Sequence, residues 1–325
     1  MRPRRKTHTT MKLIHMKTLI IAAAPFAMAI LLTTPAAAQY NGENVLGDYG
    51  LKSGTQAPPG FYAGYLFYKY DTHTVRGPNG GSLPGGGNTE LNAYAHILAP
   101  TWVLPTKILG ANVGGMVAFP WLNTVIDSPR ISSTGSFAIS DIYVQPLNLG
   151  WHFKRADAIA GYAFTAPSGK FEPGGENNRG KGFWSNELSL GSTVYLDQKK
   201  TWHAATTGFY EMHTTRKGGD VKVGDILTLE GGVGKTLKQI INVGPVYYAQ
   251  WKVTADSGTG VSELFRNNKH RVFGVGPEVN VFLPTKMSGQ NVESGLSASV
   301  RYLWETGAVM KTEGRSLIIS LAYLF

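Results

Sequence analysis

The sequence predicts an antiparallel transmembrane β-barrel of about 12 strands with both termini in the periplasm. Three observations predict this fold class: an export signal at the N-terminus, many short segments in which apolar and polar residues alternate, and a last segment that alternates up to Phe325. The 40 Gly and 11% aromatic residues suit strands joined by turns. No apolar stretch of about 18 residues follows the signal, so the sequence offers no transmembrane helix.

The first 38 residues read as a secretory signal peptide. Six basic residues and no acidic residue occur there, followed by an apolar run at 18–32 and small residues at 36–38 that form a cleavage site. We expect cleavage after Ala38 and export to the bacterial outer membrane. A retained N-terminal anchor is the alternative, for which the apolar run is short. The start codon stays open among Met1, Met11 and Met16.

Net charge and cysteine content exclude several classes of protein. The chain has a net charge of +10, but six of its 31 basic residues lie in the first 38, which leaves 25 basic against 21 acidic residues. A net charge of +4 on the rest of the chain does not call for a nucleic-acid partner. The absence of Cys excludes a disulfide scaffold, a cysteine-ligated metal and a cysteine nucleophile.

Twelve segments alternate with the period of two that a strand with two different faces requires. In the clearest of them, 184–196, Leu188, Leu190 and Val194 alternate with Glu187 and Thr193. The expected strands are 60–71, 90–104, 110–121, 137–151, 158–167, 184–196, 202–213, 224–237, 241–255, 269–283, 292–306 and 315–325. Long connections, expected outside the cell, lie at 72–89, 122–136, 168–183 and 256–268. Short periplasmic turns include Pro105-Thr106-Lys107, and Leu104-Pro105-Thr106-Lys107 recurs as Leu283-Pro284-Thr285-Lys286.

The two ends of the mature chain are expected to have different roles. The segment 39–59 reads as an irregular periplasmic lead-in, for which an exposed tail is favoured over a small plug in the lumen. A terminal strand that ends in Phe325 resembles the signal read by the outer-membrane barrel assembly machinery. The expected division is therefore a signal peptide at 1–38, the lead-in at 39–59 and the barrel at 60–325.

The polar faces of the expected strands favour a membrane barrel over a soluble one. A soluble sandwich or lipocalin-like barrel also alternates, but Lys and Glu usually dominate its solvent face. Here Gly, Ser, Thr, Asn and Tyr dominate, and charges are costly against lipid, so this face should line the lumen. The candidate lumen-lining residues are Glu90, Tyr94, Asp141, Tyr143, Glu187, Glu211, Glu230, Tyr248, Lys252, Glu278 and Arg301. An open lumen and a lumen filled by these side chains are both compatible with the pattern.

Two of these acids are expected to lie close together at the extracellular mouth. The strand 184–196 descends and the strand 202–213 ascends, so Glu187 and Glu211 fall near the extracellular ends of neighbouring strands. Paired acids at a pore mouth favour cations and neutral solutes over anions.

Several segments of the chain resemble a known family. The matching blocks are Asp141-Ile142-Tyr143-Val144-Gln145-Pro146-Leu147, Gly161-Tyr162-Ala163-Phe164, Thr201-Trp202-His203-Ala204-Ala205, Gly224 to Gly231, and Tyr247-Tyr248-Ala249-Gln250-Trp251. As a set they resemble the family called MetA-pathway of phenol degradation, over roughly 58–325. The resemblance implies an outer-membrane β-barrel, often labelled a transporter and tied loosely to the catabolism of aromatic compounds. It implies no catalytic residues.

Searches for catalytic chemistry give no site. The segment 231–236 looks like the end of a phosphate-binding loop, but the required first glycine is replaced by Leu229 and the segment reads as a strand. The histidines of the mature chain fall on separate strands and loops, so we expect no metal site and no cofactor. Serines near His152 or His203 leave a Ser-His hydrolase as a minor alternative.

Taken together, these features predict an outer-membrane channel for the passive passage of small aromatic or hydrophobic compounds, and not an enzyme. A structural or adhesive barrel with a closed lumen is the alternative. The expected partners are outer-membrane lipids, the barrel assembly machinery and a small-molecule solute. The solute, the direction and gating of passage, and the oligomeric state stay open.

Overall fold

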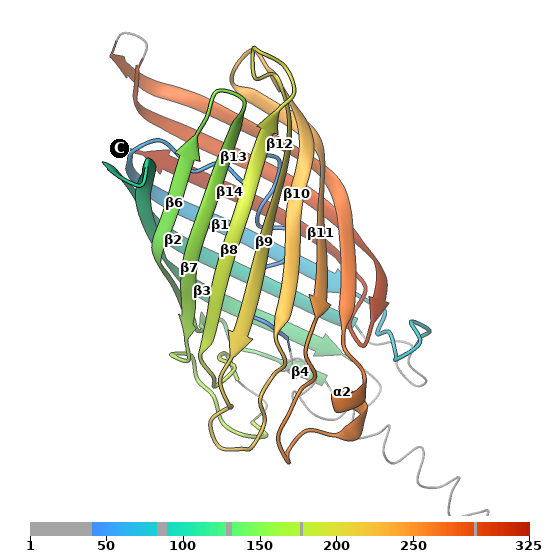
Figure 1. The fold of residues 1–325 in the computed structure, drawn as a ribbon. Helices are drawn as coiled ribbons and strands as arrows, with labels where there is room; N and C mark the ends of the chain where they lie inside the picture. The colour runs from blue at the N-terminus through green and yellow to red at the C-terminus, as the bar shows by residue number, and fades with distance from the viewer. Residues whose placement is uncertain (1–40, 83–89, 128–131, 176–177, 289–290) are drawn as a thin grey trace, which may run out of the picture.

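A computed structural model of the chain describes residues 41–82, 90–127, 132–175, 178–288 and 291–325 (Figure 1). The expected signal peptide, 1–38, lies outside the described residues. Twelve long strands make up the wall: β1 (Gly60–Thr72), β2 (Glu90–Ile108), β3 (Ala111–Asp127), β6 (Ile142–His152), β7 (Ala156–Ala166), β8 (Ser185–Tyr195), β9 (Trp202–His213), β10 (Ile226–Leu237), β11 (Ile241–Lys252), β12 (Arg271–Ser288), β13 (Asn291–Val309) and β14 (Arg315–Leu324).

Three small elements complete the described chain. The short strands β4 (Ser132–Thr134) and β5 (Ala138–Ile139) both pair with β3, and the helix α2 (Glu263–Asn267) precedes β12. Within the described ranges, no helix is both long and apolar enough to cross a membrane.

The sheet closes on itself. Each long strand pairs antiparallel with the next along the chain, and β14 pairs with β1 from Tyr62 opposite Leu324 to Asp71 opposite Arg315. Closure gives each of the twelve long strands a partner on both sides, whereas the short strands β4 and β5 pair with β3 alone. The predicted antiparallel barrel of twelve strands is thereby confirmed, and all twelve expected segments correspond to strands.

The two rims of the barrel differ in their connections. At one rim, the turn end, β2 and β3 are joined by Leu109 and Gly110 alone. Both residues have positive φ values, 51° and 81°, as a type I′ hairpin turn requires, and a glycine adopts that conformation without strain. β1 begins and β14 ends at the turn end. At the opposite rim, the loop end, the connections 167–184, 214–225 and 253–270 are longer.

Two turns predicted from proline are wrong. The repeated Leu-Pro-Thr-Lys tetrapeptides lie inside β2 and β12, which continue to Ile108 and Ser288. Proline has no N–H to donate, and at both places the pairing register shifts, between Val103 and Lys107 and again between Pro284 and Lys286. The missing hydrogen bond therefore produces a β-bulge, after which the strand resumes. β3 likewise continues to Asp127, into the segment expected to be a loop.

The outer face of the barrel is apolar and the inner face polar along β8, as predicted. Leu190 is 71% exposed on the outer face, whereas its near neighbour Thr193 is fully buried on the inner face. Glu187 and Ser189 share the inner face with Thr193, and Leu188 and Val194 share the outer face with Leu190. This alternation follows from the pleat, which sends successive side chains to opposite faces.

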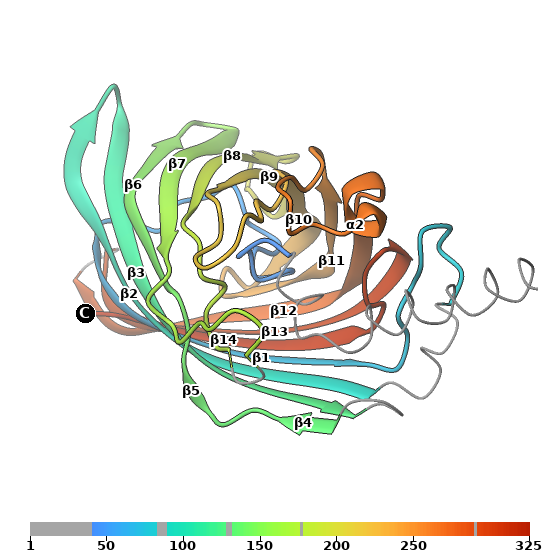
Figure 2. The same cartoon turned by 90° about the horizontal axis from the view of Figure 1, so that it is seen from below.

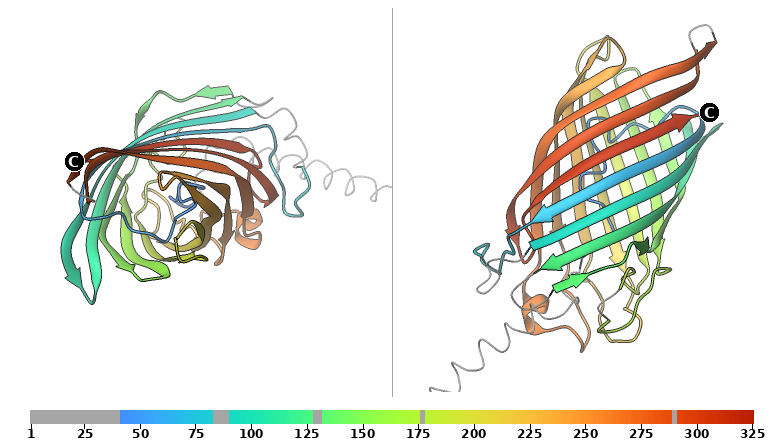
Figure 3. Two further views of the ribbon diagram at one scale, coloured as in Figure 1. Left: turned by 90° about the horizontal axis from the view of Figure 1, so that it is seen from above. Right: turned by 180° about the vertical axis from the view of Figure 1, so that it is seen from behind.

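The N-terminal segment 41–59, which we call the plug, lies inside the barrel up to Gln56, and its exposed last residues, 57–59, lead into β1. Views along the barrel axis show it within the ring of strands (Figures 2 and 3). Leu46 and Leu51 of the plug are buried, and its main chain is hydrogen-bonded to residues of β9, β10 and β12. The preference for an exposed tail was therefore wrong, because this segment has hydrogen-bonding partners and apolar contacts within the lumen.

Candidate functional site in the barrel lumen

Three wall carboxylates hold the main chain of the plug. The Glu211 side chain on β9 accepts the N–H groups of Glu43 and Asn44 at 2.5 and 3.2 Å. Glu230 on β10 accepts those of Gly47 and Tyr49 at 2.9 and 2.8 Å. Glu278 on β12 accepts the N–H of Leu51 at 2.9 Å. Because the plug is irregular, its backbone donors have no ladder partners, and these charge-assisted bonds satisfy them.

Arg301 on β13 connects the plug to the wall through its guanidinium group. Its Nε lies 2.9 Å from Glu278 Oε2, and its Nη1 donates to the main-chain oxygen of Asp48 at 2.6 Å. Glu278 thus binds both Arg301 and the plug amide of Leu51. The ion pair and the plug form one buried network, so loss of one member leaves the others without partners.

The other side of the plug is apolar. Leu46 and Leu51 pack in a buried cluster with side chains from the barrel wall. The wall residues of this cluster are Leu66, Val246, Tyr248, Val272, Leu303, Ala308 and Ile318, with Tyr68 and Ile97 packed against it. The plug is therefore held both by carboxylates of β9, β10 and β12 and by an apolar cluster with residues of β1, β11, β12, β13 and β14.

The beginning of the plug is attached to the loop-end connection 167–184. Lys181 forms an ion pair with Glu43 at 3.1 Å and also bonds the main-chain oxygen of Gly42. Asp141 accepts the N–H groups of Gly169 and Lys181 at 2.8 and 2.7 Å, which fixes that loop. Burial raises the pKa of Glu43 to about 7, and Lys181 opposes part of this shift.

The end of the plug is attached near the turn end. Thr55 Oγ1 donates to Asp157 Oδ2 at 3.0 Å, and Gln56 Nε2 donates to the main-chain oxygen of Asn148 at 2.8 Å. Gly54 lies so close to β8 that a Cβ atom there would be 2.2 Å from the main-chain carbon of Ser192. Only glycine allows this approach.

Nine of the eleven residues named as lumen-lining point inward, but most of them are engaged with other groups. Glu211, Glu230, Glu278 and Arg301 bind the plug. The others have partners in the wall or in the loops: Asp141 as above, Tyr143 with Glu187 at 3.1 Å, Tyr248 with Glu305 at 2.7 Å, and Lys252 with Asp256 at 2.6 Å.

Two of the eleven face outward, and their assignment to the lumen is corrected. On β2, Ala95 and Val103 are buried whereas Leu98 is exposed, so even-numbered residues of this stretch are on the outer face. Tyr94 therefore lies outside, where Lys69 of β1 contacts its ring, and Glu90 lies on the same face. The segment has apolar residues on both faces, so its periodicity could not fix the phase.

The expected acidic mouth at Glu187 and Glu211 is also corrected. The two residues do lie directly opposite each other on β8 and β9. However, both are buried, and they face Tyr143 and the plug rather than an open entrance. The plug residues that meet them were not predicted from the sequence. The surplus of inward carboxylates, together with the glycines at 42, 47, 50 and 54, was the available signal.

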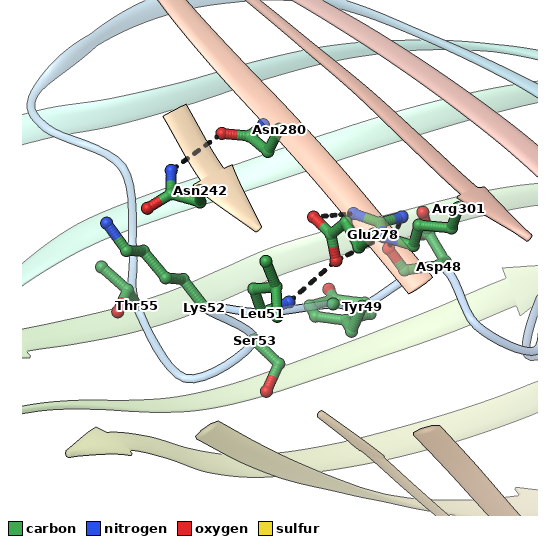
Figure 4. A pocket seen from close by; sticks show the side chains of 11 residues that line it. Asp48, Tyr49, Leu51, Lys52, Ser53, Thr55, Asn242, Glu278, Asn280 and Arg301 are labelled. Atoms are coloured by element: carbon green, nitrogen blue, oxygen red, sulfur yellow. Dashed lines mark hydrogen bonds and ion pairs between the residues drawn. The ribbon is translucent and has the colours of Figure 1, made fainter. Parts of the chain in front are cut away.

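A cavity of about 240 Å³ remains between the plug and the wall formed by β11, β12 and β13 (Figure 4). Lys52 and Thr55 of the plug lie on the same side of it as Asn242, whereas the Glu278–Arg301 ion pair and Asp48 lie on the other side. Tyr49, Leu51, Ser53 and Asn280 also line it.

Among the described residues, no hydroxyl is hydrogen-bonded to either histidine named as a hydrolase candidate. His152 Nδ1 bonds Asp157 at 3.1 Å, but the hydroxyls nearby, Thr55 and Tyr195, donate to the same carboxylate and not to the imidazole. Both ring nitrogens of His203 are buried without a hydrogen-bond partner. Across the described part of the chain, no three His, Asp or Glu residues are grouped so that they could hold a metal ion.

A family model described as "Putative MetA-pathway of phenol degradation" matches residues 72–320, which is most of the chain. The chain belongs to this family. No curated protein matches it in sequence. Among solved structures, the COG4313 outer membrane channel from Pseudomonas putida F1 is similar, with a TM-score of 0.69 and 12% identity over 87% of this chain and 100% of that one.

Two further barrels show a weaker likeness to this member of the family. The TodX monoaromatic hydrocarbon channel, as a deltaS2 mutant, gives a TM-score of 0.38 at 11% identity, over 87% of this chain and 100% of that one. A FadL homologue from Pseudomonas aeruginosa gives 0.37 at 7% identity, over 82% and 90%. At these identities, the likeness to the Pseudomonas putida channel shows the fold, that of an outer-membrane β-barrel.

Proposed function

We propose that this chain is an outer-membrane channel for the passive passage of small aromatic or hydrophobic compounds, and that it has no catalytic activity. The observation that carries the proposal is a closed barrel whose lumen is occupied by its own N-terminal segment through non-covalent contacts alone. Membership of a family named for phenol degradation, and a fold shared with a solved outer-membrane channel, support the solute class and the route.

The plug acts as the gate in this proposal. Its bonds to Glu211, Glu230 and Glu278 are hydrogen bonds that water can replace when the segment moves. Its apolar contacts through Leu46 and Leu51 are of a kind that a hydrophobic solute can also make. Displacement of the plug would therefore open a lumen with an acidic wall and an apolar one.

The channel proposal also includes a location and an orientation of the barrel in the membrane. An apolar outer face with Leu188, Leu190 and Val194 exposed is suited to outer-membrane lipid. We propose export through cleavage of the signal peptide, insertion by the barrel assembly machinery, and a periplasmic position for the turn end. The loop end would then face the cell exterior, where outer-membrane barrels carry their longer loops.

A structural or adhesive barrel with a closed lumen is the second candidate. The buried cluster around Leu46 and Leu51 favours it, since this packing fills the middle of the lumen. The two functions differ in whether the plug moves under working conditions.

Conductance and uptake distinguish the two candidates. The purified protein and a variant lacking 41–57 are inserted into planar bilayers and into liposomes, and current and phenol entry are measured. The channel predicts small or intermittent currents and phenol entry for the parent protein, and larger, continuous currents after the deletion. If the deletion variant conducts but the parent admits neither ions nor phenol, the closed structural barrel is supported. If both variants are silent while correctly folded, the channel proposal is wrong.

A further inference from the structure

The cavity beside the plug is lined by one donor group without an acceptor, the Lys52 ammonium group, and by two amides that each keep an unused N–H. No hydrogen bond or ion pair of the Lys52 ammonium group is present within the described residues, although the side chain is only partly exposed. Burial lowers the pKa of Lys52. The negative charge of Asp157 raises this pKa, and the positive charge of Lys200 lowers it. A partly buried ammonium group without a partner is unfavourable, and an anionic group placed next to it would relieve that cost.

Two amides that line the same cavity as Lys52, those of Asn242 and Asn280, have donors to spare. Asn242 Nδ2 donates one hydrogen to Asn280 Oδ1 at 3.1 Å (Figure 4). Asn280 Nδ2 in turn donates one to Ser297 Oγ at 3.1 Å. Each amide nitrogen carries two hydrogens, so each retains one N–H. The oxygen of Asn242 already accepts from Thr236 at 2.7 Å, and this bond orients the amide.

The hydroxyls that line the cavity donate away from it. Ser53 Oγ donates to the main-chain oxygen of Glu230 at 3.3 Å, and Thr55 Oγ1 donates to Asp157 at 3.0 Å. The carboxylate of Glu278 is bound by Arg301 and by the amide of Leu51. The Lys52 side of the cavity is therefore rich in donors. On the acidic side, Glu278 is bound by its own partners, and the Asp48 carboxylate is influenced by the charge of Arg301.

We propose that this cavity is a binding subsite for the carboxylate of a small aromatic acid. The Lys52 ammonium group and the free N–H groups of Asn242 and Asn280 would bind the two carboxylate oxygens. The volume of about 240 Å³ lies below the range of roughly 300–1,000 Å³ that holds drug-sized ligands, so a single ring fits best. The inference rests on the proposed channel function, for which it names a solute class and a stopping point on the way through.

Calorimetry on the full barrel in detergent tests the subsite with benzoate as the probe and benzamide as its neutral counterpart. A charged hydrogen bond is worth a factor of about ten or more in affinity, so Lys52→Met should weaken benzoate binding by at least about tenfold. Lys52→Arg should retain binding. Asn280→Asp, which is nearly the same size, should weaken it through like-charge repulsion. Benzamide should bind more weakly than benzoate and be indifferent to Lys52→Met.

Lys170→Met is the matched control, because it removes the same charge from an exposed loop residue. Heat-modifiable migration in gels shows whether each variant is folded. The subsite is refuted if folded Lys52→Met binds benzoate as the parent does, if the Lys170→Met control loses as much affinity, or if the parent protein does not bind benzoate.

The measurement separates this inference from the channel itself. Phenol uptake by the parent protein together with benzoate binding that ignores Lys52 would overturn the subsite and leave the channel intact. A barrel that passes no solute, yet binds benzoate through Lys52, would overturn the proposed function and leave a binding site in the lumen.

Discussion

Arg301 and Glu278 form an ion pair at 2.9 Å inside the lumen, and each of them also bonds the plug, Arg301 through the oxygen of Asp48 and Glu278 through the N–H of Leu51. The two side chains come from neighbouring strands, β13 and β12, and stand opposite each other in the ladder. A single pair therefore connects two strands to a segment more than 200 residues away in the sequence.

Removing one member of this ion pair should lower the free energy of unfolding more than removing both members. Arg301→Leu leaves Glu278 buried without its partner, which typically costs about 3–5 kcal/mol of unfolding free energy. The double variant Arg301→Leu with Glu278→Leu should recover part of that loss. Guanidinium unfolding in lipid vesicles measures both. A double variant less stable than Arg301→Leu alone would contradict the assignment of the cost to an unpaired charge.

A side chain at Gly54 should displace the plug without opening the barrel. Gly54→Val would place Cβ against the main chain of Ser192, and neither backbone can yield easily. We expect larger channel currents and faster proteolysis of the segment 41–59, with unchanged heat-modifiable migration. Gly81→Val is the control, since a Cβ there has nothing within 4 Å. Equal currents in the two variants would show that the contact with Ser192 does not hold the plug.

The first residues of the plug should loosen as the pH rises. Burial raises the pKa of Glu43 in the folded protein from 4.5 to about 7, so the folded state favours its neutral form. This contribution is fully present below pH 4.5 and is lost as the pH rises through 7, at most about 3 kcal/mol at 1.4 kcal/mol per pH unit. Lys181, Asp141 and Glu211 are the charged groups acting on Glu43.

Hydrogen exchange of the amides at 42–44, followed between pH 4 and 9 after correction for the intrinsic rate, measures this loosening. Glu43→Gln should keep the protection seen at low pH across the whole range. If the parent protein and Glu43→Gln show the same pH profile, titration of another group governs the plug.

Removal of Phe325 should slow insertion into the outer membrane. Its N–H donates to the main-chain oxygen of Phe61 at 3.1 Å, and its ring lies 4.9 Å from that of Tyr323 and 5.9 Å from that of Phe61. The deletion variant should accumulate as a protease-sensitive form in the periplasm, whereas Phe325→Tyr should insert normally. Fractionation and gel migration report the outcome, and normal insertion of the deletion variant would remove Phe325 as the assembly signal.

The sequence predicts which side chains of a strand face the lumen only where the two faces of the strand differ clearly in polarity. On β8 the contrast between Leu190 and Thr193 is large, and the facing was predicted correctly. On β2, Tyr94 and Leu98 lie on the outer face while Ala95 and Ile97 lie inside, so both faces carry apolar side chains and the phase was wrong. Proline was also misleading, because one missing N–H bends a long strand without ending it.

The sequence by itself determined the fold class, the number of strands and most of the residues that point inward, because the period of two is a local property of the extended chain. Only the tertiary structure decided what those residues do. Glu230 and Glu278 bind amides 183 and 227 residues away, in a plug without any periodicity. Closure of the barrel selects such partners, because it brings an irregular segment with unsatisfied backbone donors against buried carboxylates.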